Sequence, residues 1–171
     1  IVFFGGSFHP WHEGHQSCLK LLPNEKTCFI LPDRNPEKKL QNINTVSTIL
    51  QISTHARFKE NQFLVPTFLL SYQKNPTVKW ISKFTHQYPS VISSLLLGFD
   101  SFNSLTHWID AEQLLACLQR LYVVPRLETY KQRETSTEKI RKLNKDIEII
   151  FLDRHQFEHL SSTKMRKKEK D

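Results

Sequence analysis

The chain has 171 residues, of which 39% are hydrophobic and 24% charged, a balance that fits one α/β domain and excludes a largely disordered chain. No apolar run approaches the ~20 residues that a membrane-spanning helix needs, and no basic and then apolar leader is present; the first residue already reads as part of a strand, so we expect that a residue or two has been lost before it. A net charge of +7 suits anionic partners.

The cysteines and the basic tail indicate the cellular compartment and the kinds of partner to expect. Cys18, Cys28 and Cys117 are widely spaced, odd in number and without metal-ligand spacing, which predicts buried free thiols, no metal site built from them and a cytoplasmic protein. Much of the excess positive charge lies in residues 164–170. Because no aromatic side chains are interleaved there, a solvated helix end is expected, and neither a nucleic acid nor a membrane is expected as a partner.

Strands and helices alternate in the first half of the chain. In chain order we expect a strand over residues 1–4, a helix over 13–22, a strand over 27–31, a helix over 45–58 and a strand over 63–65. The first strand ends at Gly5 and Gly6, and the second leads into a polar, basic loop over residues 33–39. Asn75 and Pro76 then have the pattern of a cap residue followed by a proline at the first helical position.

The same alternation continues to the end of the chain. We expect a helix from Pro76 to about 86, a buried strand over 91–97, a helix over 110–117, a strand over 121–124, a helix from the capping-box spacing at 135–138 to about 143, a strand over 147–152 and a short basic helix after 161–163. Buried strands joined by helices require crossovers, which predicts a doubly wound parallel sheet. One domain over residues 1–171 is expected, with a shortened carboxyl-terminal helix.

The polar loops of this pattern follow strands. Ligands of such sheets bind at the carboxyl ends of the strands, where the strand order switches. The loops over residues 5–15, 33–39, 98–100 and 125–126 all come directly after predicted strands, and residues 161–163 follow the last strand at a greater distance. We therefore expect these loops to converge on one edge of the sheet and to form the site there.

Two histidines mark the first of these loops. His12 and His15 are three residues apart across a helix start, so both side chains can face the same side. Free backbone amides at a strand end and a helix start form an anion site, and histidine donates hydrogen bonds to phosphate oxygens. The pair beside Gly5 and Gly6 favours a phosphate site, with a capping or core role as the alternative.

Three further features admit a functional and a structural interpretation. Ser161–Thr163 followed by Arg166 could clasp a phosphate from the far side, or could be an ordinary helix cap. Asp100, which follows a buried strand and a glycine, could bind ribose hydroxyls or close a turn. Trp108 could stack on a flat heterocycle or belong to the core.

Together these residues resemble a known superfamily. Gly5-Gly6-Ser7-Phe8, Pro10 and His12-x-Gly14-His15 resemble the amino-terminal signature of the nucleotidyltransferases, and Ser161-Ser162-Thr163-x-x-Arg166 resembles their carboxyl-terminal motif. Within that superfamily, Gly98-x-Asp100, Trp108, Val123-Val124-Pro125-Arg126 and the segment Leu31-Pro32, Pro36 and Lys39 look like the bacterial nicotinate-nucleotide adenylyltransferases.

The resemblance implies a Rossmann-like fold and a reaction. ATP and nicotinate mononucleotide would be joined to give deamido-NAD and pyrophosphate, with Mg²⁺ accompanying ATP. By resemblance the catalytic residues are His12, His15 and Arg166, those that bind ATP are Gly6, Ser7, Phe8, Gly98, Asp100, Ser162 and Thr163, and those that bind the acceptor are Trp108, Lys39 and Arg126. No residue is assigned to hold a metal.

Departures from the family pattern leave alternatives open. His9 stands where the family usually has aspartate, and the stretch Ser71–Thr77 matches the acceptor-recognition segment only with a shift. A related transferase acting on nicotinamide mononucleotide, phosphopantetheine or CTP is one alternative. A non-catalytic module that binds nucleotides or RNA is another, and the oligomeric state, a homo-oligomer included, stays open.

Overall fold

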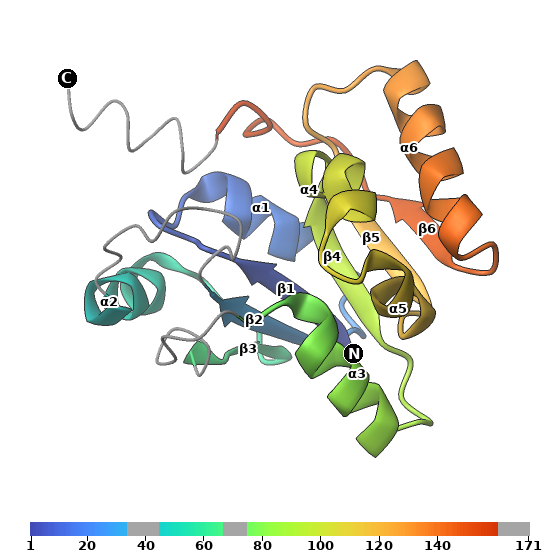
Figure 1. Cartoon of the computed structure of the whole chain (residues 1–171). Coiled ribbons are helices and arrows are strands. Elements are labelled where there is room, and N and C mark those ends of the chain that lie inside the picture. Colours follow the sequence, from blue (N-terminus) through green and yellow to red (C-terminus); the bar gives the residue numbers. More distant parts are fainter. Residues whose placement is uncertain (34–44, 67–74, 161–171) are drawn as a thin grey trace.

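The computed structural model describes residues 1–33, 45–66 and 75–160, which form an α/β fold around a six-stranded sheet (Figure 1). All strand pairs are parallel and the strand order is β3-β2-β1-β4-β5-β6. The strands are β1 (Val2–Gly6), β2 (Cys28–Pro32), β3 (Gln62–Leu64), β4 (Ser94–Gly98), β5 (Arg120–Val124) and β6 (Glu148–Phe151). This order confirms the predicted doubly wound sheet, with its switch between β1 and β4.

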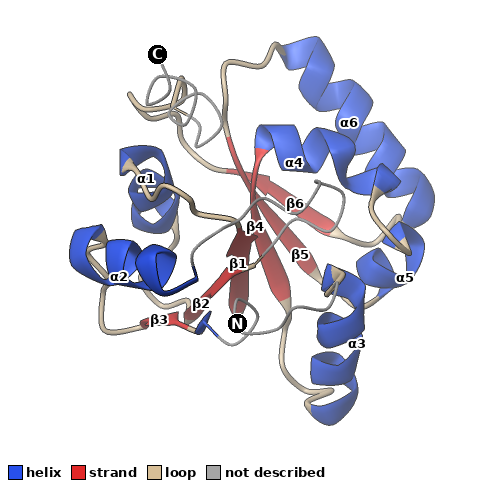
Figure 2. Cartoon of the chain, turned by 60° about the vertical axis from the view of Figure 1, so that its left-hand side comes forward, coloured by secondary structure: helices blue, strands red, loops and turns tan. Residues whose placement is uncertain are grey.

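Helices cover both faces of the sheet (Figure 2). They are α1 (Glu13–Leu21), α2 (Thr45–His55), α3 (Thr77–Gln87), α4 (Phe99–Ser104), α5 (Ala111–Ala116) and α6 (Tyr130–Leu143), with a 3₁₀ turn at Leu105–His107. Leu19 of α1 and Ile52 of α2 pack in one buried cluster, while α3, α5 and α6 contribute to a second one on the other face. The four inner strands β1, β2, β4 and β5 are therefore largely buried on both faces, as their continuous apolar composition predicts.

The strand pairing opens the sheet at the switch point. β1 pairs with β2 over its whole length, and β4 does the same with β5. Between β1 and β4, however, only Val2 and Phe3 are in register with Ser94 and Leu95. The carboxyl ends of the two central strands therefore separate, and the crevice between them is where a doubly wound sheet binds its ligand.

Several predicted boundaries were wrong, among them the end of α2, which is His55 and not residue 58. The helix α6 begins at Tyr130 and not near 135, because Thr129 and Gln132 form the capping box that the sequence suggested at Thr135. β4 begins at Ser94, three residues later than expected, and runs straight into α4, a short helix that was not predicted. Pro76 is the cap residue of α3 and precedes the first helical position.

None of the helices in the described ranges is both long and apolar enough to cross a bilayer. Cys18 and Cys28 are buried free thiols, as predicted, and Cys117 is half-buried. Burial raises the pKa of the Cys18 thiol to about 12, so this group stays protonated at neutral pH although it lines the pocket described next.

Candidate active site

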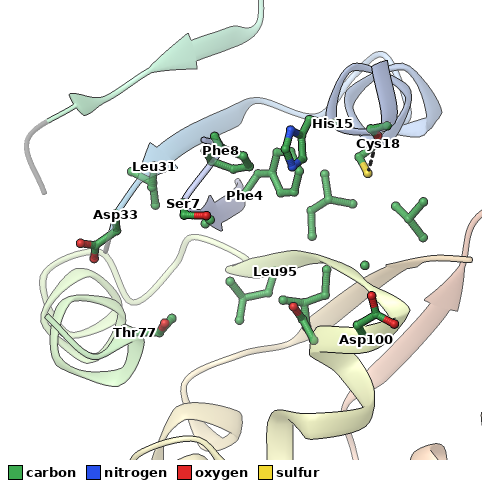
Figure 3. Close-up of a pocket in the computed structure, with 18 of the residues that line it drawn as sticks. Phe4, Ser7, Phe8, His15, Cys18, Leu31, Asp33, Thr77, Leu95 and Asp100 are labelled. Atoms are coloured by element: carbon green, nitrogen blue, oxygen red, sulfur yellow. Dashed lines mark hydrogen bonds between the residues drawn. The ribbon is translucent and has the colours of Figure 1, made fainter. Parts of the chain in front are cut away.

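A pocket of about 590 Å³ fills the crevice between β1 and β4. Its floor is formed by the strand ends that separate there, Phe4–Gly6 and Leu95–Gly98. His15 and Phe8 lie on one wall and Asp100 on the opposite one, while Asp33 and Thr77 lie toward one end (Figure 3). The loops after β1, β2, β4 and β5 all contribute lining residues, which confirms their predicted convergence on one edge.

His12 serves both as a helix cap and as a pocket residue. Its backbone is extended and its Nδ1 accepts a hydrogen bond from the Gly14 N–H at 3.1 Å, which closes the start of α1. A neutral imidazole whose Nδ1 accepts must carry its proton on Nε2. Among the described residues nothing accepts a hydrogen bond from that buried Nε2, and His12 lines the pocket. The fold therefore presents an N–H donor to a ligand in the pocket.

His15 lies one turn later, and its ring stacks on His12 with centroids 3.7 Å apart. The rings of Phe8 and Trp11 also surround it, at 5.0 Å and 5.2 Å. Its Nδ1 is buried without a hydrogen-bond partner among the described residues. A buried polar atom of this kind costs free energy unless a ligand satisfies it. The two histidines thus face one site, as their spacing predicted.

Burial favours the neutral form of both histidines. It lowers the pKa of His12 to about 4, and the positive charge of Arg126 adds to the effect. The pKa of His15 lies well below its ordinary value, first through burial and then through His12 and Arg126. An anion placed between these groups would favour their charged forms again, since an opposite charge nearby raises the pKa of an imidazole.

Glycines allow the backbone to approach these side chains. A Cβ on Gly6 would lie 2.9 Å from the ring of Phe8, and one on Gly14 would lie 2.9 Å from the ring of His12. Phe8 itself has a φ of 46° and is buried beneath the pocket. Without a side chain, Gly6 leaves room for the ring of Phe8 and Gly14 leaves room for the ring of His12. This is a physical reason for the glycines of the signature.

His9, the departure from the family pattern, turns toward α2. Its Nδ1 lies 3.1 Å from the hydroxyl of Thr48, a buried side chain. The contact joins the loop after β1 to α2. His9 is absent from the pocket lining, so in this structure it helps to order the loop.

Arg126 and Asp100 join the ends of β5 and β4. The Arg126 guanidinium lies 3.0 Å from the Asp100 carboxylate and also donates to the backbone carbonyls of Glu158 and Leu160. Both Asp100 and Arg126 line the pocket. Asp100 is largely exposed, so a ligand hydroxyl can reach its carboxylate. Arg126 links the segment after β6 to the rest of the site.

Two buried carboxylates support this segment. Glu128 accepts from the Arg126 N–H at 2.6 Å and pairs with Arg133. Glu158 accepts from the Leu127 N–H at 2.8 Å and from Arg154 at 2.7 Å. Burial alone would raise the pKa of Glu128, but the hydrogen bonds that this carboxylate accepts, among them those from the Arg126 N–H and from Arg133, outweigh burial and lower the pKa. No sequence motif marks this network, because most of its members lie in the turn after β5 and in an irregular segment, and Arg133 is the member in a helix.

The other end of the pocket is lined by side chains from α3 and from the turn after α4. Trp108 is half-buried there, beside Ile109 and Ser104, and α3 contributes Thr77 and Trp80. Asn75 donates to Asp33 at 3.2 Å. Of these, Trp108 is a predicted site residue, and Asn75 and Thr77 belong to the predicted acceptor segment, Ser71–Thr77. The sequence does not mark Trp80 as a pocket residue, because an aromatic residue at helical spacing is typical of the core, and Trp80 does pack on Phe3.

Several predicted site residues lie outside the described ranges. These are Lys39, Ser162, Thr163 and Arg166, together with residues 71–74 of the expected acceptor segment. Their roles stay predictions. The remaining predicted residues, Gly6, Ser7, Phe8, His12, His15, Gly98, Asp100, Trp108 and Arg126, all line the one pocket. They come from loops that are far apart in sequence.

The described residues include no group of three metal-ligating side chains. Mg²⁺ in nucleotide sites is commonly held by phosphate oxygens, water and one or two carboxylates. Asp33 and Asp100 are the acidic residues among the pocket lining, and Asp100 is already paired with Arg126. The donor set therefore fits an ion that arrives on the nucleotide and keeps most of its ligands there.

Comparison with known proteins agrees with this geometry. The family model described as cytidylyltransferase-like matches residues 3–168. A relative from Leptospira interrogans, named probable nicotinate-nucleotide adenylyltransferase, is 29% identical over 72% of this chain and 65% of its own length. One of the same name from Methylacidiphilum infernorum is 25% identical over 99% of this chain and 80% of its length. The matched part thus spans just under two thirds of the Leptospira protein.

A solved structure shares the fold. It is the nicotinic acid mononucleotide adenylyltransferase of Plasmodium falciparum complexed with NaAD, with a TM-score of 0.73 at 21% identity over 98% of this chain and 82% of that one. At this identity the likeness concerns the fold. The family match, by contrast, covers nearly the whole sequence and includes all the residues that line the pocket. The chain belongs to the cytidylyltransferase-like family.

Proposed function

We propose that the protein is a nicotinate-nucleotide adenylyltransferase, which joins ATP and nicotinate mononucleotide to give deamido-NAD and pyrophosphate. The observation that carries the proposal is the stacked pair His12 and His15 at the switch point of the sheet. Each ring has one buried nitrogen, Nε2 of His12 and Nδ1 of His15, without a hydrogen-bond partner among the described residues. Relatives of consistent name over most of the chain support the choice of reaction.

The chemistry needs no covalent enzyme intermediate. A phosphate oxygen of the mononucleotide attacks the α-phosphorus of ATP, a new P–O bond forms, and the bond to the bridging α–β oxygen breaks to release pyrophosphate. Negative charge grows on the phosphoryl oxygens during this step. N–H donors that are already in place stabilise such charge without having to reorganise. His12 and His15 are placed to do this, with their rings held by the Gly14 N–H and by Phe8 and Trp11.

The two ends of the pocket divide the substrates. ATP is assigned to the end formed by Gly6, Ser7, Phe8, the histidines, Gly98 and Asp100, where Asp100 can accept from ribose hydroxyls. The mononucleotide is assigned to the end with Trp108, whose indole offers a stacking face for a pyridine ring. Mg²⁺, when bound with ATP, offsets phosphate charge.

Three residues outside the described ranges complete the proposal. Ser162, Thr163 and Arg166 are assigned to the departing pyrophosphate, and Lys39 to the acceptor, on the resemblance of their motifs. This assignment is supported by the residues just before Ser161, because Arg126 donates hydrogen bonds to the backbone carbonyls of Glu158 and Leu160.

The test is the release of pyrophosphate from ATP in the presence of single acceptors. We expect release with nicotinate mononucleotide and deamido-NAD as the second product. Parallel reactions contain nicotinamide mononucleotide or phosphopantetheine in place of nicotinate mononucleotide, or CTP in place of ATP. Release with one of these and none with nicotinate mononucleotide would assign the protein to another reaction of the family. RNA binding that survives deletion of residues 167–171 without any release would favour a non-catalytic module.

A further inference from the structure

His155 is a pocket residue that the motifs of the chain do not include. It follows β6, is half-buried and lines the pocket. Its Nδ1 accepts a hydrogen bond from the Phe157 N–H at 3.2 Å. Burial lowers its pKa, with a smaller contribution from Arg126, while Glu158 acts in the opposite sense. The ring is therefore neutral at pH 7, and with Nδ1 accepting, its Nε2 carries the proton.

The segment that carries His155 lies against the start of α1. The Phe157 carbonyl oxygen is 3.5 Å from the place that a Cβ on Gly14 would occupy, and Gly14 is the residue that His12 caps. Arg126 binds the carbonyls of Glu158 and Leu160 in the same segment. Three elements distant in sequence thus meet at one end of the pocket.

The groups at this end are nearly all donors. His12 offers Nε2–H, His155 has the same protonation pattern, and Arg126 adds a positive charge that acts on both rings. Asp100 is the acidic residue that faces them, and it is paired with Arg126. A ligand rich in acceptors and negative charge satisfies such a set, and phosphate oxygens fit it.

We propose that His155 is a third histidine of the nucleotide end, donating from Nε2 to an oxygen of the ATP phosphates. This inference rests on the proposed function for the identity of the nucleotide. It adds a binding residue from the segment after β6, which is not part of either signature motif.

Two variants separate a ligand contact from a structural role. Asparagine at position 155 can still accept from the Phe157 N–H, as asparagine does in Asx turns, but it lacks the ring and its Nε2. His155→Asn and His155→Ala should therefore raise the KM for ATP alike, by about 10- to 100-fold for one lost hydrogen bond to a charged group. The KM for the acceptor should change less than twofold. If His155→Asn behaves as wild type while His155→Ala is impaired, the histidine only orders the turn and the proposal is overturned.

Binding of ATP alone, measured by calorimetry, keeps the test independent of the acceptor. Wild-type protein that binds ATP but makes no deamido-NAD would contradict the proposed function and leave this inference testable. Adenosine, measured as a competitor of ATP, identifies the part of the nucleotide involved. We expect the His155→Asn variant to bind ATP more weakly and adenosine as wild type does. An equal loss for both ligands would place the contact on the base or ribose and would refute the phosphate assignment.

Discussion

The rings of His12 and His15 stack with their planes only 22° apart. Protonating either ring places a positive charge against its neighbour and near Arg126, and burial removes the water that would screen it. The two imidazoles are therefore neutral at pH 7 and can donate hydrogen bonds without repelling each other. A triphosphate supplies the negative charge that this arrangement lacks.

Substitution of His12 separates its two roles. His12→Asn should keep the cap on α1, because asparagine is among the best cap residues, yet it removes Nε2. We expect kcat to fall by about 10²- to 10³-fold, the scale for one electrostatic stabiliser, with little change in thermal stability. His12→Ala should show the same loss of kcat and should also lower the free energy of unfolding by about 1 kcal/mol. Activity of His12→Asn near that of wild type would show that His12 only caps the helix.

The depressed histidine pKa values make stability depend on pH. The pKa of His12 is about 4 in the folded protein and about 6.5 in an unfolded chain. Between these values the unfolded chain binds more protons, so the free energy of unfolding falls as the pH is lowered from about 6.5 to 4. His15 acts in the same direction, since burial lowers its pKa as well.

Urea unfolding at several pH values measures this effect. In His12→Asn the fall with decreasing pH should be shallower than in wild type, by at most about 1.4 kcal/mol per pH unit. The difference will be smaller where water in the pocket screens the ring. Curves for the two proteins that run parallel from pH 7 to 4.5 would show that His12 titrates normally in the folded state.

The fold was predictable because its signals are local. Apolar runs bounded by proline or glycine, such as the one before Gly5 and Gly6, mark strands that are buried on both faces. Alternation with helices then requires parallel pairing. The start of α6 was misplaced because a local signal had a competitor nearby: Thr129 and Gln132 cap the helix, although Thr135 has the same spacing to Glu138.

The site was predictable where a motif needs close backbone approach and not where side chains meet through tertiary structure. Gly6, Gly14 and the histidines occur within ten residues of one another, and steric contact explains their spacing. His155 and Glu158 lie in an irregular segment with no periodicity. His155 lines the pocket, and its segment is held in place by Arg126 and Arg154, which bind the backbone carbonyl and the carboxylate of Glu158. No local pattern carries that information.

The paired glycines at the end of β1, Gly5 and Gly6, should respond differently to alanine. A Cβ at position 6 would lie 2.9 Å from a ring atom of Phe8, and Phe8 is only 2% exposed, so its ring has little room to move. Gly6→Ala should therefore lower the free energy of unfolding by about 1–3 kcal/mol, as overpacking does, and should reduce activity. Thermal unfolding measures the first effect and pyrophosphate release the second.

Gly5→Ala is the matched control for that substitution. No atom lies within 4 Å of a Cβ at position 5, and no glycine among the described residues has a positive φ. The variant should be as stable as wild type or slightly more stable, because alanine restricts the unfolded chain. Equal destabilisation by both substitutions would mean that the contact with Phe8 does not explain the glycine at position 6.

The two tryptophans of the pocket should have different roles. Trp108 is half-buried at the end assigned to the acceptor, whereas Trp80 packs edge-on against Phe3, with ring centroids 5.1 Å apart. Trp108→Ala should raise the KM for nicotinate mononucleotide about tenfold, the scale of one lost stacking contact, and the KM for ATP less than twofold. Trp80→Ala should instead lower the free energy of unfolding by about 2–3 kcal/mol, since it leaves a gap beside Phe3.

Steady-state kinetics with each substrate varied, together with urea unfolding, distinguishes the roles of the two tryptophans. A larger effect of Trp108→Ala on ATP than on the mononucleotide would move the indole to the nucleotide end, and a loss of stability without any change in KM would place it in the core.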